Sequence, residues 1–323
     1  MRKMTKLSVC VCLCLSVASL ALAAPPATPA LLTMGEIRSL VEGGRYKDAL
    51  SPISRALALQ GPAAAAYDRH ELFMLRAECQ LQNKDQTNAI AALNHAKKEA
   101  ITARQFGKLA APTALAALVQ KSVGYKYTPK NAKEGFSVLD LSQRPAAYAA
   151  LLADEFPQAK SKVDALNHAK TMAPILEAAK LVGTLRALEI VTKSDPPQTA
   201  PLVAAVTTHT DRLTTAAIDS FAKQSTDIRN NAQQIVRDTV GVYDQSSQQS
   251  WLQPRTRRRG VTNQEAATLR SIMADCDKIR ASAAEIATAL ATDFETYQAI
   301  ATKADAMKAK AAVVLNDDYS VVP

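Results

Sequence analysis

Residues 43–56 read GGRYKDALSPISRA, and residues 83–96 read NKDQTNAIAALNHA. In both stretches a glycine or polar turn is followed by apolar residues spaced three and four apart, which is the period of one helix face. Gly44 corresponds to Lys84 and Ala49 to Ala89, so the two stretches are 40 residues apart. The sequence therefore predicts two consecutive helical hairpins within residues 34–100.

The ends of these helices carry separate signals. Thr33 and Glu36 have the spacing of a capping box, in which the threonine accepts from a free helix amide and the glutamate reaches back. Gly61 and Pro62 end the second helix, because glycine and proline are both poor at continuing one. Four antiparallel helices joined by short turns are expected.

The run Gly44–Leu50, together with Ala56 at the end of the second helix, resembles a tetratricopeptide repeat. In the second half Phe73 stands at the first-helix aromatic position and Ala77 at the small one. The period of 40 is longer than the roughly 34 residues of that family. A plain pair of helical hairpins would share the same pattern, so both descriptions stay open.

The resemblance implies a groove that holds a protein or peptide partner. Side chains of the inner helices are the candidates for that surface, and we select Tyr46, Arg76 and Gln80. Two repeats cannot bury a stable core alone. We therefore expect the next helices, near residues 112–122, 145–170 and 174–193, to complete a helical-repeat domain over 33–193, with an irregular loop at 124–140.

The second half of the chain predicts long helices. No proline occurs between Pro201 and Pro254, nor from there to Pro323. Apolar residues from Leu269 to Ala311 keep a near-heptad stripe, which is typical of coiled-coil packing. We expect an antiparallel coiled-coil-like hairpin over 201–315, a connecting loop at 245–263 and a short tail at 316–323. The predicted fold class is all-α.

The N-terminus predicts export. Arg2, Lys3 and Lys6 precede an uncharged apolar run, and Ala21-Leu-Ala23 then forms a small-residue cleavage site. Residues 1–23 are therefore predicted to be a signal peptide, followed by a proline-rich leader at 24–32. A retained anchor is the alternative, although the run is short for a spanning helix. The expected location is the periplasm or the extracellular space.

Basic residues are concentrated in one place. The chain has 39 basic and 30 acidic residues, and loss of three basic residues with the signal peptide lowers the formal charge from +9 to +6. Four arginines lie in the predicted 245–263 loop, close to the single tryptophan: Trp251, Arg255, Arg257, Arg258 and Arg259. Arginine suits phosphate and carboxylate groups. An anionic membrane or envelope polymer is the predicted target, and a solvated or protease-sensitive loop is the alternative. Nucleic acid is not expected.

Three of the five cysteines lie in the predicted signal peptide. Cys79 and Cys276 remain, in a compartment that permits disulfides. Each falls in an apolar helical pattern, and free cysteine is often a small core residue. The sequence leaves open a bridge between them or two buried thiols.

Motifs for catalysis or cofactor binding are not found. The sequence has no Walker loop, dinucleotide glycine motif or nucleophile elbow, and its histidines show no metal-ligand spacing. We therefore predict no cofactor and no metal. The leading hypothesis is a non-enzymatic, exported helical-repeat scaffold that binds a protein or peptide. The alternative is an envelope-binding structural protein that uses Arg255–Arg259.

Overall fold

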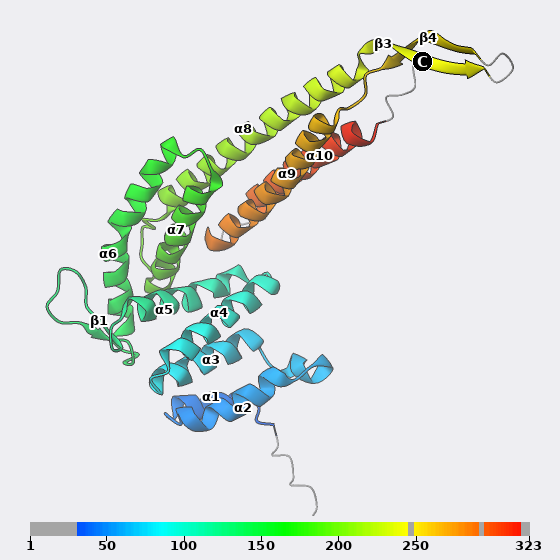
Figure 1. The fold of residues 1–323 in the computed structure, drawn as a ribbon. Coiled ribbons are helices and arrows are strands. Elements are labelled where there is room, and N and C mark those ends of the chain that lie inside the picture. The colour runs from blue at the N-terminus through cyan, green and yellow to red at the C-terminus, as the bar shows by residue number, and fades with distance from the viewer. Residues whose placement is uncertain (1–30, 245–248, 291–293, 318–323) are drawn as a thin grey trace, which may run out of the picture.

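The computed structural model describes residues 31–244, 249–290 and 294–317. The predicted signal peptide, nearly all of the predicted leader and all but the first two residues of the predicted tail lie outside them. Helices make up most of the described chain, and the strands form two small two-stranded sheets (Figure 1). The all-α class is confirmed. Within the described ranges, none of the helices combines the length and apolar character needed to cross a membrane.

The first part consists of stacked helices, drawn in blue and cyan in Figure 1. They are α1 (Met34–Glu42), α2 (Tyr46–Ala58), α3 (Arg69–Gln82) and α4 (Gln86–Thr102), with a 3-10 turn η1 (Gly61–Ala66) between α2 and α3. The capping box is present: the Thr33 amide donates to Glu36 at 2.7 Å, and the Glu36 amide donates to the Thr33 hydroxyl at 3.3 Å. The predicted helix order and start are confirmed.

The same turn ends α1 and α3. Gly44 and Lys84 both have positive φ, 73° and 60°, and in each case the next amide donates to the carbonyl five residues earlier, at 2.9 and 2.8 Å. This is the Schellman motif, which satisfies the free carbonyls at a helix end. Glycine adopts this backbone freely, whereas lysine does so at a cost of about 1–2 kcal/mol. The 40-residue repeat is thus a repeat of backbone geometry.

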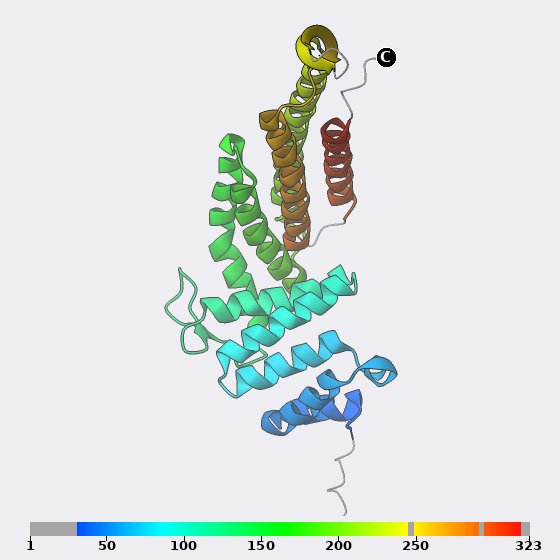
Figure 2. The same cartoon turned by 45° about the vertical axis from the view of Figure 1, so that its right-hand side comes forward.

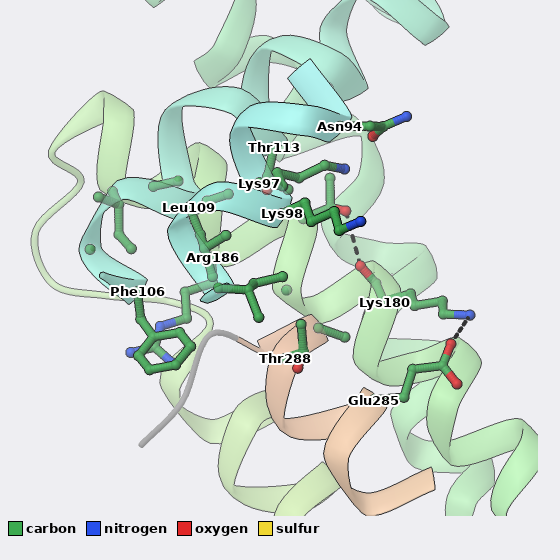
Figure 3. A pocket seen from close by; sticks show the side chains of 18 of the residues that line it. Asn94, Lys97, Lys98, Phe106, Leu109, Thr113, Lys180, Arg186, Glu285 and Thr288 are labelled. Atoms are coloured by element: carbon green, nitrogen blue, oxygen red, sulfur yellow. Dashed lines mark hydrogen bonds and ion pairs between the residues drawn. The ribbon is translucent and has the colours of Figure 1, made fainter. Parts of the chain in front are cut away.

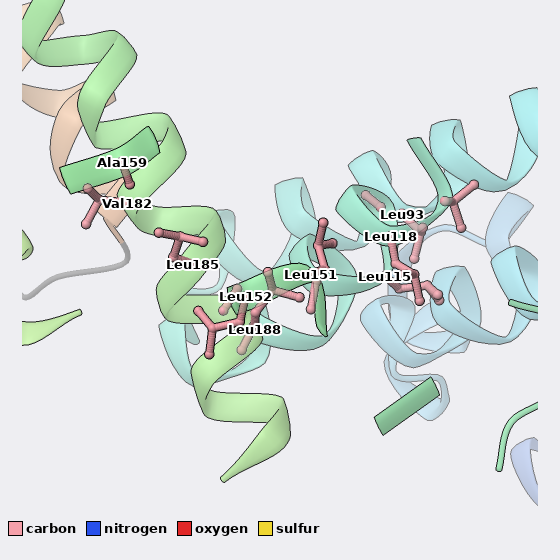
Figure 4. Close-up of a cluster of buried hydrophobic side chains, with 14 of the residues drawn as sticks. Leu93, Leu115, Leu118, Leu151, Leu152, Ala159, Val182, Leu185 and Leu188 are labelled. Carbon is pink, nitrogen blue, oxygen red and sulfur yellow. The ribbon is translucent and has the colours of Figure 1, made fainter. Parts of the chain in front are cut away.

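The middle of the chain completes the core. A 3-10 turn η2 (Phe106–Leu109) leads into α5 (Ala110–Lys121), and the strands β1 (Lys126–Tyr127) and β2 (Phe136–Ser137) form a small hairpin. Then come α6 (Arg144–Asp164), a 3-10 turn η3 (Ala165–His168) and α7 (Met172–Thr192). Leucines from α4 to α7, including Leu118, Leu151 and Leu185, meet in one buried cluster (Figure 4). This cluster joins the repeat helices to α6 and α7.

A buried ion pair fastens the same junction. The Arg144 guanidinium donates to both carboxylate oxygens of Glu78 on α3, at 2.6 and 2.9 Å, and its Nε donates to the Val138 carbonyl at 2.7 Å. The side chains are 8% and 15% exposed. The Gln82 amide adds hydrogen bonds to Glu78 and to the Leu139 carbonyl, at 2.8 and 2.7 Å. Helix α3, the segment before α6 and the start of α6 are thereby linked.

The last part is a rod of three helices, not a two-helix hairpin (Figures 1 and 2). It consists of α8 (Ala200–Gln233), α9 (Asn263–Leu290) and α10 (Phe294–Asn316). Ion pairs join Asp277 to Lys308 at 2.7 Å and Arg280 to Asp305 at 3.6 Å, so the partner number falls as the α9 number rises and the two helices are antiparallel.

The predicted single long helix over 269–311 is therefore wrong. Its stripe is nevertheless buried, since Ile272 and Cys276 of α9 share a cluster with Ala304 and Met307 of α10. The three- and four-residue spacing continues on both sides of the reversal. Periodicity reports which face is buried, but it does not report the direction in which the chain runs.

The predicted loop at 245–263 is also wrong. Strand β3 (Ile235–Asp244) pairs antiparallel with β4 (Gln249–Arg258), in a register that places Ile235 opposite Arg258 and Val242 opposite Trp251. Residues 235–244 are rich in β-branched side chains, which favour strands. The two strands form a ribbon that projects from the far end of the rod (Figure 1).

We predict that breaking the Glu78–Arg144 pair destabilises the fold strongly. Glu78→Gln or Arg144→Met should each lower the free energy of unfolding by about 3 kcal/mol, because one charge is left buried without its partner. The double variant should lose less than the sum. Urea unfolding measures these values. Arg38→Ala, which removes a more exposed pair with Glu71, is the control and should cost about 1 kcal/mol or less. Equal losses for both pairs would contradict the prediction.

Candidate functional site

A cavity of about 840 Å³ lies where the repeat helices meet α7 and the end of α9 (Figure 3). Helix α4, η2 and the start of α5 form one wall, and α7 and α9 form the other. The lining residues come from five elements: Asn94, Lys97, Lys98, Ile101, Thr102, Phe106, Gly107, Leu109, Ala110, Thr113, Lys180, Gly183, Thr184, Arg186, Ala187, Ile190, Glu285, Thr288 and Ala289. Segments that are far apart in sequence therefore build one site.

Close packing between α7 and α9 shapes the second wall. A Cβ atom at Gly183 would lie 1.8 Å from the carbonyl oxygen of Ala289, so only glycine allows this approach. Three residues along α7, the Arg186 guanidinium donates to the Leu290 carbonyl at 3.0 Å. Carbonyls at a helix C-terminus lack intrahelical partners and carry partial negative charge. Arg186 thus holds the end of α9 against α7.

One part of the cavity is apolar. Ile101 of α4, Phe106 and Leu109 of η2, and Ala187 and Ile190 of α7 contribute to its lining. Ile190 is 51% exposed, which is unusual for a large aliphatic side chain beside a well-packed core. An apolar ligand would remove this surface from water, and such burial is favourable.

The charged lining is mostly positive. Lys97 and Lys98 lie on α4, Lys180 and Arg186 on α7, and the acidic residue of this lining is Glu285 on α9. The Lys180 amine pairs with the Glu285 carboxylate at 2.9 Å. In Figure 3 the three lysines lie toward one side of the cavity and Phe106 toward the other. The cavity is therefore amphipathic, with a cationic and an apolar side.

Lys97 is the most unusual of these cations. It stands four residues after Leu93 and three before Ala100, both buried, and so occupies the buried stripe of α4. It is half-buried, and this burial lowers the pKa of its amine because a charged group is poorly solvated there. Among the residues that the structure describes, we find no hydrogen bond or ion pair to this amine.

The predicted partner surface fares differently at its three residues. Gln80 is only 6% exposed, and its Oε1 has no hydrogen-bond partner within the described protein, so it does not offer an open contact as predicted. Tyr46, at the start of α2, and Arg76, on α3, are half-buried and do not line the cavity. Their binding role stays a prediction.

The chain itself covers part of α3. Arg76 and Gln80 are four residues apart on one side of this helix, whereas Glu78 and Gln82 lie on another side and bind Arg144 and the Leu139 carbonyl. The segment that precedes α6 therefore occupies surface that an isolated hairpin would offer to a partner. Sequence spacing alone did not indicate this cover.

The predicted arginine cluster is divided by the ribbon. Arg255 and Arg257 are exposed, and Arg258 is half-buried. Arg259 is an anchor, because it pairs with Glu265 at 2.5 Å and its Nε donates to the Asn231 carbonyl at 3.0 Å. Trp251 lies on β4, opposite Val242, and its side chain lies outside the described part of the structure.

Cys79 and Cys276 are free, buried thiols rather than a bridge. They belong to separate clusters, one formed by α1 to α3 and the other by α8 to α10. Burial, with a smaller effect from the neighbouring Glu78 carboxylate, raises the pKa of Cys79 to about 11. Burial, followed by the nearby Asp277 and Asp275 carboxylates, also raises the pKa of Cys276.

Metal-binding groups do not cluster in the described ranges: no set of three or more histidine, cysteine, aspartate or glutamate side chains is placed to hold an ion. Comparison of the chain with protein families, with curated proteins and with solved structures gives no match. The argument about function therefore depends on the geometry of the cavity and the ribbon.

We predict that neither thiol reacts in the native protein. Because the thiolate is the nucleophile, the raised pKa of both cysteines should keep Ellman's reagent from reacting at mildly alkaline pH. In concentrated guanidinium without reductant, a chain that begins at Ala24 should release colour from both thiols. Absence of reaction under those denaturing conditions would instead show a disulfide.

Proposed function

We propose that the protein is a non-enzymatic, exported binding scaffold whose main ligand site is the cavity between the repeat helices and α7 and α9. The observation that carries this proposal is the cavity itself. Its volume of about 840 Å³ falls in the range of roughly 300–1,000 Å³ that is typical of small-ligand sites. Its lining combines apolar side chains with a few charged groups, as such sites do.

The placement of the cavity supports a scaffold role. A ligand there touches α4 and η2 on one side and α7 and α9 on the other, so binding would stabilise one relative position of the two parts of the molecule. The tetratricopeptide-like resemblance implies a protein or peptide partner in addition. Tyr46 and Arg76 remain the residues proposed for that contact.

We predict that filling the cavity abolishes binding of a neutral apolar dye. Thr184→Trp places a large ring in the lining, and the affinity for Nile red should fall about ten-fold or more, since about 1.4 kcal/mol of lost contact is enough. Fluorescence titration measures this affinity. Thr208→Trp on the exposed side of α8 is the matched control, because both threonines donate to the carbonyl four residues earlier, at 2.9 Å. Equal dye binding by the two variants would exclude the cavity as the site.

A second candidate function is attachment to an anionic surface through the ribbon. The specific observation is the position of Arg255 and Arg257, which are exposed on a ribbon that extends beyond the rod (Figure 1). Successive strand residues alternate between faces, so residues two apart share one face. A flat anionic membrane could therefore contact both arginines together.

We predict that Arg255→Gln with Arg257→Gln weakens binding to vesicles that contain phosphatidylglycerol. Each arginine near such a surface contributes about 1 kcal/mol, so the partition coefficient should fall roughly 30-fold at low salt. Vesicle sedimentation measures it. Lys223→Gln with Arg229→Gln on α8 removes the same charge from exposed positions elsewhere. Equal loss in the two double variants would show that net charge, not the ribbon, governs binding.

A further inference from the structure

We propose that the cavity binds a single-chain anionic amphiphile, an acyl chain that ends in a carboxylate or a phosphate. This inference rests on the proposed function for its site and adds the chemical class of the ligand. Lys97 and Lys98 would face the anionic head, and the apolar residues of η2 and α7 would contact the chain.

The charge of the lining selects an anion. Lys97, Lys98, Lys180 and Arg186 are positive, and the acidic side chain in the described lining, Glu285, is already paired with Lys180. Arg186 is partly committed as well, through its hydrogen bond to the Leu290 carbonyl. The two lysines of α4 therefore provide the positive charge that remains for a ligand, and they would repel a cationic amphiphile.

Lys97 gives the head group its position. Its amine is half-buried beside the apolar stripe of α4, where poor solvation opposes the charged form. A carboxylate or phosphate oxygen against this amine would form a charge-assisted hydrogen bond, which is stronger than a neutral one. Lys98, the next residue, is exposed and lines the same cavity, so it can contact the outer side of the same head group.

The chain would occupy the apolar side. Figure 3 shows Phe106 and Leu109 on the side away from the lysine amines, and Ile190 of α7 also lines the cavity. A cavity of about 840 Å³ is of the size that encloses one small ligand, which favours a single chain over a larger lipid. One molecule with a charged end and an apolar end matches both sides of the cavity.

The test compares four ligands that share a dodecyl chain and differ in the head group. Isothermal titration of the purified protein should show that laurate and dodecyl phosphate bind about ten-fold or more tightly than dodecanol, with dodecyltrimethylammonium the weakest. The two anions are separate arms: preference for laurate indicates a fatty acid, and preference for the phosphate indicates a phospholipid-derived ligand.

Variants at the head-group end complete the test. Lys97→Met keeps the length of the side chain and removes its charge, so it should weaken both anions about ten-fold and leave dodecanol unchanged. Lys223→Met at an exposed position of α8 is the control and should change none of the affinities.

The outcomes separate this inference from the proposed function. If Thr184→Trp abolishes Nile red binding but all four head groups bind alike, the cavity is a ligand site and the anionic class is overturned. An unchanged anion affinity in Lys97→Met also overturns it. If neither Nile red nor any dodecyl ligand binds the protein, both proposals fail.

Discussion

The buried ion pair between Arg144 and Glu78 is the constraint on which the arrangement of the molecule depends. It joins α3, which belongs to the repeat helices, to α6, which leads into the second part of the chain. A pair removed from water gives stability only when its remaining polar groups are satisfied. Here the Val138 carbonyl and the Gln82 amide meet that need, so the pair also fixes the segment between β2 and α6.

A second buried carboxylate sets the direction of the rod. Glu189, near the end of α7, is 5% exposed and accepts hydrogen bonds from the Gln198 amide and from the amide and hydroxyl of Thr199, at the start of α8. Negative charge at a helix N-terminus is favourable. Because α7 also contacts α9 through Gly183, this one helix positions both α8 and α9. The cavity wall formed by α7 and α9 follows from that packing.

Sequence patterns predicted what is local and missed what depends on chain direction. The capping box at Thr33 and the turns at Gly44 and Lys84 are local, and they are present as expected. The stripe through Cys276 predicted burial correctly but could not show that α10 runs back beside α9. The β-branched residues after Ile235 were a strand signal, which helical spacing up to that residue obscured. The cavity joins α4 to α7 and α9, and periodicity within single helices carries no information on such contacts.

Lys97 was the one signal for the cavity within the sequence, and comparison with Gln80 explains its value. Both are polar residues in the buried stripe of a helix, and each breaks the pattern that would stabilise the fold. Gln80 is enclosed, with an unsatisfied oxygen and no space beside it that the structure shows as a cavity. Lys97 borders a cavity of about 840 Å³. A methionine at residue 97 would fill the same stripe without the cost of partly desolvating an amine. Because the lysine faces space that a ligand can occupy, its cost is recovered only when an anion is bound, which distinguishes a binding residue from a packing defect.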